Sequence, residues 1–235
     1  MIKKIFDKHE TLICILLIVL YVVTNSLCMQ NFGLESLPSV IINTALSLLL
    51  ILLIFALKAW RHYGFVKVGQ WKNFLYFIPL VLIASVNLWN GININNTHEE
   101  ILFHILAMIN VGFIEEVIFR GFLFKMMAKD NERAAVIVSS VTFGIGHIVN
   151  LLNGAALVPT LLQICYAFAA GYLFVVIFQK SGSILPCIIT HCLVNSLSIF
   201  NIDNALSLYI APAFLIIIPL AYAFYINKVF KKKEV

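Results

Sequence analysis

The fold is decided by residues 101–124, which read ILFHILAMINVGFIEEVIFRGFLF. As a helix this run is long enough to cross the hydrocarbon core of a bilayer, which takes about 20 residues. It nevertheless carries Glu115, Glu116 and Arg120. A charge inside a membrane costs about 3 kcal/mol on insertion scales, so such residues usually face a protein interior or a watery cavity and serve a function.

The rest of the chain has the same apolar character. Of its 235 residues 62% are hydrophobic and only 11% are charged, whereas a soluble domain carries about 25% charged residues. This composition excludes a water-soluble fold, a disordered chain, a nucleic-acid binder and a disulfide-stapled secreted module. We expect an all-α polytopic integral membrane protein, a single domain over 1–235 without internal repeats. Its eight or so predicted transmembrane helices are 11–28, 38–58, 74–90, 101–124, 134–152, 156–178, 184–200 and 206–227.

The basic residues predict the orientation of these helices. Fifteen of the 16 Lys and Arg residues lie before the first run, after the last, or in every second loop, and the alternate loops have none. The positive-inside rule then places both termini in the cytoplasm. The first run is expected to remain as a helix, because it is too long for a signal peptide and no cleavage site follows it. The fifteen residues are Lys3, Lys4, Lys8, Lys58, Arg61, Lys67, Lys72, Lys125, Lys129, Arg133, Lys180, Lys228, Lys231, Lys232 and Lys233.

The sixteenth basic residue, Arg120, lies inside the fourth run with the two glutamates. Glu116 and Arg120 are four residues apart and share a helix face, so they are expected to form a structural ion pair. Glu115 lies about 140° around the helix from Arg120. The spacing therefore leaves Glu115 as an unpaired carboxylate inside the membrane, and we expect it to be functional.

Two other predicted helices carry polar groups at a similar depth. His147 follows Phe143 by one turn in FGIGH, and His191 and Asn195 share a face in HCLVN. Counted from the cytoplasmic ends, Glu115, His147 and His191 are about 13, 20 and 10 Å deep. We therefore expect the fourth, fifth and seventh helices to meet at one polar site in the cytoplasmic half of the membrane.

These side chains suit the hydrolysis of an amide bond. A buried carboxylate beside an imidazole can deprotonate a water molecule. An imidazole and a carboxamide on one face can donate hydrogen bonds to the oxyanion that forms. A metal site stays open as an alternative, because His147, His191 and Glu115 are also a ligand set for catalytic zinc.

Three motifs in order, EEVIFRG at 115–121, FGIGH at 143–147 and HCLVN at 191–195, resemble EExxxR, FxxxH and HxxxN of the CPBP family. This family comprises the CAAX prenyl endopeptidases and bacteriocin-processing enzymes, also called Abi proteins. The resemblance covers the motif-bearing half of the chain, about 101–200. It implies an intramembrane peptidase whose cavity opens toward the cytoplasm. In that mechanism the glutamate and histidine of the first two motifs activate the water.

By the same resemblance His191 and Asn195 hold the oxyanion, and Glu116, Arg120 and Phe143 support the site. No cofactor is expected, with zinc as the alternative. The expected partners are a membrane-associated peptide or protein substrate and the lipid bilayer, with no nucleic acid. Other function classes also stay open: a non-catalytic immunity or binding protein that keeps the protease fold, and a proton-coupled transporter. The transporter reading predicts broken helices, and none is expected here.

One further cluster, HEEILFH at 98–104, looks like a zinc-protease motif. The HExxH pattern requires a second histidine at position 102, which is Leu102. His98 and His104 are also about 240° apart on a helix. The cluster lies at the opposite membrane surface from the basic loops and is expected to be a solvated helix start.

Overall fold

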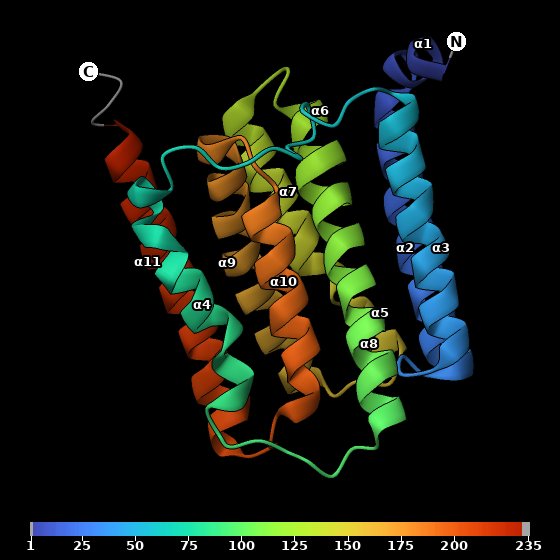
Figure 1. Ribbon diagram of the computed structural model, residues 1–235, viewed down its shortest axis with the longest axis vertical. Helices are drawn as coiled ribbons and strands as arrows, with labels where there is room; N and C mark the ends of the chain where they lie inside the picture. Colours follow the sequence, from blue (N-terminus) through green and yellow to red (C-terminus); the bar gives the residue numbers. More distant parts are fainter. Residues whose placement is uncertain (1, 232–235) are drawn as a thin grey trace.

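The chain folds into an upright bundle of helices, seen in the computed structural model, which describes residues 2–231 (Figure 1). No β-strand occurs within this range. The helical segments are α1 (Ile2–Lys8), α2 (Glu10–Phe32), α3 (Leu37–Ala56), η1 (Trp71–Phe77), α4 (Ile78–Ala84), η2 (Val86–Leu88), α5 (His98–Glu116), η3 (Val117–Phe124), α6 (Lys125–Met127), α7 (Glu132–Gly146), α8 (Val149–Leu152), α9 (Leu157–Ser181), α10 (Leu185–Leu197), η4 (Ser198–Phe200), η5 (Leu206–Ile210) and α11 (Ala211–Lys231).

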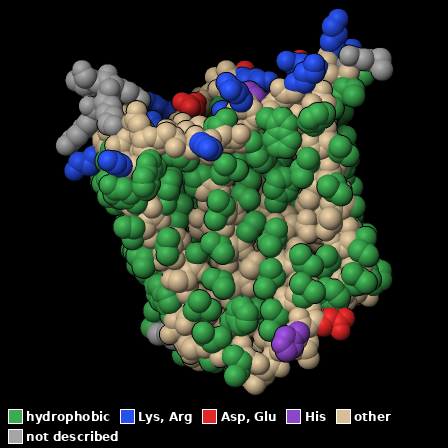
Figure 2. Space-filling view, viewed as in Figure 1, with side chains coloured by type: hydrophobic (Ala, Val, Ile, Leu, Met, Phe, Trp, Pro, Cys, Tyr) green, Lys and Arg blue, Asp and Glu red, His purple; other side chains and the backbone are tan. Residues whose placement is uncertain are grey.

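The all-α polytopic membrane fold is confirmed. Seven helical stretches of the described residues are long and apolar enough to cross a bilayer. They match seven of the eight predicted runs. The remaining run corresponds to Leu185–Phe200, which is apolar but shorter. The surface of the bundle is correspondingly hydrophobic over most of its height (Figure 2).

Charge separates the two ends of the bundle. Lys and Arg gather at the end where α1 and the last turns of α11 lie (Figures 1 and 2). The opposite end carries the links between α2 and α3, between α7 and α9, and between α10 and α11. We call the two ends the basic end and the asparagine end, the latter after its loops NINN at 93–96 and NIDN at 201–204. Lys232 and Lys233 of the predicted basic tail lie outside the described residues.

Local signals fix where the helices start. The Thr97 side chain accepts from the Glu100 amide and the Glu100 side chain accepts from the Thr97 amide, so a capping box starts α5. Ser36 caps α3 with a Pro in its first turn. Pro186 likewise stands in the first turn of α10. These starts lie close to those that the apolar runs predict.

The third span departs from the expected regular helix. It consists of η1, α4 and η2, and its backbone takes positive φ angles at Leu75, Tyr76 and Phe77. Such angles are rare for residues other than glycine. The expectation of unbroken helices is therefore wrong for this span. The apolar pattern of this part of the sequence does not distinguish one regular helix from three short helical segments.

Packing between helices places the motif-bearing segments at the centre. α5 packs against α10 and α3, and α9 packs against α7 and α11, while η3 contacts α2 and α7. The fourth, fifth and seventh predicted helices are therefore neighbours, as the expected polar site requires.

Candidate active site

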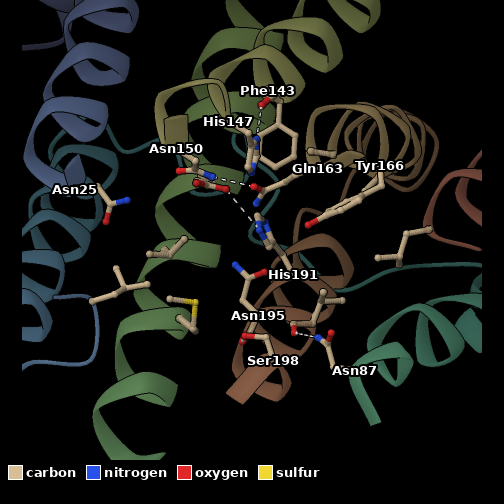
Figure 3. Close-up of a pocket in the computed structure, with 18 of the residues that line it drawn as sticks. Asn25, Asn87, Phe143, His147, Asn150, Gln163, Tyr166, His191, Asn195 and Ser198 are labelled. Carbon is tan, nitrogen blue, oxygen red and sulfur yellow. Dashed lines mark hydrogen bonds and ion pairs between the residues drawn. The ribbon is translucent and has the colours of Figure 1, made fainter. Parts of the chain in front are cut away.

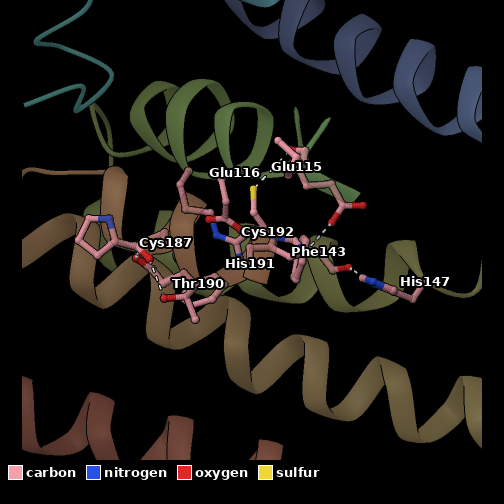
Figure 4. Close-up of polar contacts among 12 residues, drawn as sticks. Glu115, Glu116, Phe143, His147, Cys187, Thr190, His191 and Cys192 are labelled. Carbon is pink, nitrogen blue, oxygen red and sulfur yellow. Dashed lines mark hydrogen bonds and ion pairs between the residues drawn. The ribbon is translucent and has the colours of Figure 1, made fainter. Parts of the chain in front are cut away.

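The two glutamates lie where α5 gives way to the wider turns of η3. η3 is a π-helix, and each of its eight residues is buried. π-helical turns are rare and are frequent at functional sites. Adjacent residues of a helix point about 100° apart, so the two carboxylates share His191 as a neighbour but otherwise reach different groups (Figure 4).

Glu115 is held by two partners from distant helices. The Tyr21 hydroxyl of α2 donates to its Oε1 at 2.6 Å, and His191 Nε2 of α10 lies 3.5 Å from its Oε2. The prediction of an unpaired carboxylate is therefore wrong. Tyr21 was missed because a single tyrosine in an apolar run gives no pattern that points to a site.

Glu116 and Arg120 form the predicted ion pair. Arg120 Nη1 lies 3.1 Å from Glu116 Oε1, and neither side chain is exposed. The guanidinium carbon also lies 4.1 Å from the centroid of the Phe143 ring and 5.6 Å from that of Phe174. Aromatic faces attract a cation, the more so where water is excluded, so this charge is enclosed by one carboxylate and two rings.

Glu116 does more than neutralise Arg120. His191 Nδ1 lies 2.8 Å from the same Glu116 oxygen that faces the arginine. A carboxylate paired with a guanidinium accepts hydrogen bonds, so His191 donates from Nδ1. Its Nε2 is then the ring nitrogen that faces Glu115 and the cavity.

His147 stands just after the end of α7, one turn beyond Phe143. Its Nδ1 lies 3.0 Å from the Phe143 carbonyl oxygen. Since a carbonyl only accepts, Nδ1 carries the proton, and Nε2 of a neutral ring is left as an acceptor. The Phe143 ring packs edge-on against both His147 and His191, with centroids 5.3 and 5.8 Å apart.

His191 and Asn195 lie one turn apart on α10, as their spacing predicts. Among the described residues nothing hydrogen-bonds to the Asn195 carboxamide. α10 reaches the glutamates because α5 carries Gly112 at the crossing, where an added Cβ would lie 2.9 Å from the Cys192 backbone nitrogen. Gly112 was not singled out in the sequence, although it sets how close the two motifs come.

These side chains share one cavity of about 400 Å³ (Figure 3). Glu115, His147, His191 and Asn195 all line it, together with Phe143. The convergence expected from the sequence is therefore present. The cavity leads away from the basic end, which the positive-inside rule predicts to be cytoplasmic, whereas the family resemblance implies a cytoplasmic opening.

The metal alternative requires three donors around one point. Among the residues that the structure describes, no three His, Cys, Asp or Glu side chains are grouped in this way. Both nitrogens of His191 face glutamates, so neither is free for a metal ion. As arranged, His147, His191 and Glu115 do not fit a zinc site.

The HEEILFH cluster is only partly a solvated helix start. His98 is exposed, but the His104 ring is 6% exposed and so is buried. His104 Nδ1 lies 2.8 Å from Glu35 Oε1, and its Nε2 lies 3.0 Å from the Asn195 carbonyl oxygen. The prediction is wrong for His104, which ties the loop before α3 to the backbone of Asn195.

Fold and site together define a class: a polytopic membrane protein with a glutamate–histidine cluster lining an internal cavity. Residues 97–197 match the family model described as type II CAAX prenyl endopeptidase Rce1-like. This part holds all three motifs, so the match and the motifs point to the same CAAX protease family. The match supports a CAAX-protease-type hydrolase at family level. No curated protein and no solved structure matches the chain.

Proposed function

We propose that this protein is an intramembrane endopeptidase that hydrolyses a peptide bond of a membrane-associated peptide or protein. The observation that carries the proposal is the joint placement of Glu115, His147, His191 and Asn195 on one cavity, within the segment that matches the family. Their distances and free lone pairs suit the two tasks of amide hydrolysis, which are to activate water and to stabilise an oxyanion.

Water activation falls to Glu115 and His147. The Tyr21 hydroxyl occupies Oε1 of Glu115, which orients the carboxylate in the cavity. His147 offers its Nε2 as a second acceptor, because its Nδ1 proton is committed to the Phe143 carbonyl. A water molecule between the two groups gives one proton to Glu115 while its oxygen attacks the substrate carbonyl carbon.

Oxyanion stabilisation falls to His191 and Asn195. The Asn195 amide group is free to donate, and Nε2 of His191 faces the cavity. Because Nδ1 already donates to Glu116, a proton on Nε2 makes His191 an imidazolium, whose charge Glu116 offsets. The oxyanion then collapses as the C–N bond breaks. The amine leaves with the proton that Glu115 received, so one water molecule is consumed and two peptide ends form.

We propose that this hydrolysis needs no metal, because both nitrogens of His191 already face glutamates and no three donors of the described residues are grouped around one point. We further propose that both termini face the cytoplasm, as the basic loops predict, and that the membrane is a bacterial cell membrane, because this short chain is similar to the bacterial members of the family.

The test is cleavage of a peptide library by the purified protein in detergent. Glu115→Gln keeps the shape of the side chain but removes the base, so turnover is expected to fall at least about 100-fold. The matched control is Glu99→Gln, the same change at an exposed position of α5. Its turnover should equal that of the wild type.

A zinc chelator added to the wild-type protein tests the metal-free mechanism. Retained turnover is expected, and its loss would favour the zinc alternative. Peptide binding by the wild type without any cleavage, unchanged in Glu115→Gln, would instead favour the non-catalytic binding protein.

A further inference from the structure

The cavity opens at the asparagine end of the bundle. Most of its lining residues come from the halves of the helices nearest that end, and its rim includes Met29, which is 37% exposed, and the exposed Ala155 and Ser198. Met29 lies near the end of α2, Ala155 precedes α9 and Ser198 follows α10. Substrate can therefore reach Glu115 from this side.

The basic end of the site is closed by aromatic packing. Tyr63 and Phe122, 3% and 1% exposed, pack against each other with tilted rings whose centroids are 4.5 Å apart. The loop before η1 is also tied to the start of α10, since the Ile184 amide donates to the Gly64 carbonyl at 2.9 Å. None of these residues lines the cavity.

The walls of the cavity are mainly apolar and carry almost no charge. Of the residues that the structure describes, no Lys, Arg or Asp lines it, and Glu115 is the one carboxylate that does. The walls instead carry five carboxamides, which both donate and accept hydrogen bonds, as the peptide backbone does. These are Asn25, Asn87, Asn150, Gln163 and Asn195.

Two of these carboxamides are available to a ligand. Among the described residues, Asn25 Oδ1 is buried without a hydrogen-bond partner, and Asn195 forms its hydrogen bonds through its backbone carbonyl and not its side chain. A buried unpaired polar atom costs about 1–3 kcal/mol, and a bound backbone amide would remove that cost. By contrast, Asn150 donates to Gln163 at 2.9 Å and Asn87 donates to the Val194 carbonyl.

We propose that the substrate is a short, extended, uncharged peptide segment that enters from the asparagine end and hydrogen-bonds through its backbone to this carboxamide-lined cavity. This rests on the proposed function. The volume of the cavity is near the lower limit of ligand sites, about 300–1,000 Å³, so it takes a segment and not a folded domain. A charged substrate side chain would lose its water and find no counter-charge apart from Glu115, the base itself.

The direction of access is tested by blocking each end in turn. Ala155→Cys places a thiol on the rim, and Asp130→Cys places a matched thiol on the exposed α6–α7 loop at the basic end. Each variant is assayed in detergent before and after reaction with a bulky maleimide. Wild-type protein treated in the same way controls for native thiols such as the exposed Cys165.

Modified Ala155→Cys is expected to lose at least about tenfold in kcat/KM, a change of 1.4 kcal/mol, while modified Asp130→Cys keeps its rate. The reverse pattern, or equal loss at both ends, would overturn the direction of access. If the wild type cleaves nothing, protection of Ala155→Cys from the maleimide by an uncharged peptide would support the access route while the proposed function fails.

Substrate charge is tested with one cleaved peptide in three versions, carrying Ser, Lys or Asp beside the cleaved bond. The kcat/KM for the Lys and Asp peptides is expected to be at least about tenfold lower than for the Ser peptide. Equal kcat/KM values for the three peptides would overturn the preference for an uncharged segment. The direction of access would then still be decided by the thiol experiment.

Discussion

Among the groups around Glu115, the Tyr21 hydroxyl orients its carboxylate most directly. It comes from a helix outside the motif-bearing half, 94 residues away in sequence. The first helices of the bundle therefore do more than enclose the site. They supply a hydrogen bond to the group proposed as the base.

Tyr21→Phe removes this hydrogen bond and leaves the packing unchanged. A hydrogen bond to a charged group contributes about 1.5–3 kcal/mol, so kcat is expected to fall at least about tenfold. The control is Tyr222→Phe, a buried tyrosine that donates to the Phe74 carbonyl away from the cavity. Wild-type kcat in Tyr21→Phe would show that the hydroxyl does not position Glu115.

Arg120 and Glu116 support a second prediction at the residue scale. Removing one member of a buried ion pair costs about 3–5 kcal/mol, whereas replacing both is often neutral. Arg120→Met should therefore lower the yield and the thermal stability in detergent. The double variant Glu116→Gln, Arg120→Met should recover both.

Measuring turnover distinguishes a structural role of the Glu116–Arg120 pair from a role in catalysis. The double variant should stay poorly active, because His191 has lost the carboxylate that offsets its charge. Wild-type stability of Arg120→Met alone would contradict the buried ion pair. Full activity of the double variant would contradict the role of Glu116 toward His191.

At the scale of elements, the crossing of α5 and α10 decides whether the two motifs meet. Gly112 allows this approach, and the atoms nearest to an added Cβ belong to Cys192, partly to its backbone, which cannot rotate away. The partners of the glutamates therefore depend on a glycine that touches none of the reacting groups.

Gly112→Ala is expected to destabilise the protein by about 1–3 kcal/mol through overpacking. It should also reduce kcat, because α10 carries His191 away from both glutamates. Gly69→Ala is the control, since nothing lies within 4 Å of its added Cβ. Thermal unfolding and turnover are measured together. If thermal stability and turnover were both unchanged, the crossing of α5 and α10 would have space for an added methyl group.

On the scale of the whole molecule, the two ends differ in charge and in access. If the basic end faces the cytoplasm, as proposed, the cavity opens to the other side of the membrane. The substrate would then be a segment that is presented at the outer surface or has already crossed the bilayer.

Labelling in intact cells tests this orientation. An impermeant maleimide should label Asp203→Cys directly and should label Asp130→Cys only after the membrane is permeabilised. Both aspartates are exposed and lie at opposite ends of the bundle. Labelling of Asp130→Cys in intact cells would invert the topology and, with it, the side from which substrate comes.

Much of this architecture depends on local properties of the chain. Bilayer thickness sets the length of each apolar run, and helix periodicity sets which residues share a face. For this reason the spans, the Glu116–Arg120 pair and the shared faces of Phe143 with His147 and of His191 with Asn195 could be predicted. The third span was not predictable in the same way, because its broken backbone leaves no trace in an apolar pattern.

The partners across helices were decided by the tertiary structure alone. Tyr21 with Glu115, His191 with Glu116 and His104 with Asn195 are 94, 75 and 91 residues apart. Periodicity says which way a side chain points on its own helix but not which helix stands opposite. The position of the cavity's opening also depends on contacts between helices. Packed aromatic rings close one end, and small or polar side chains leave the other end open.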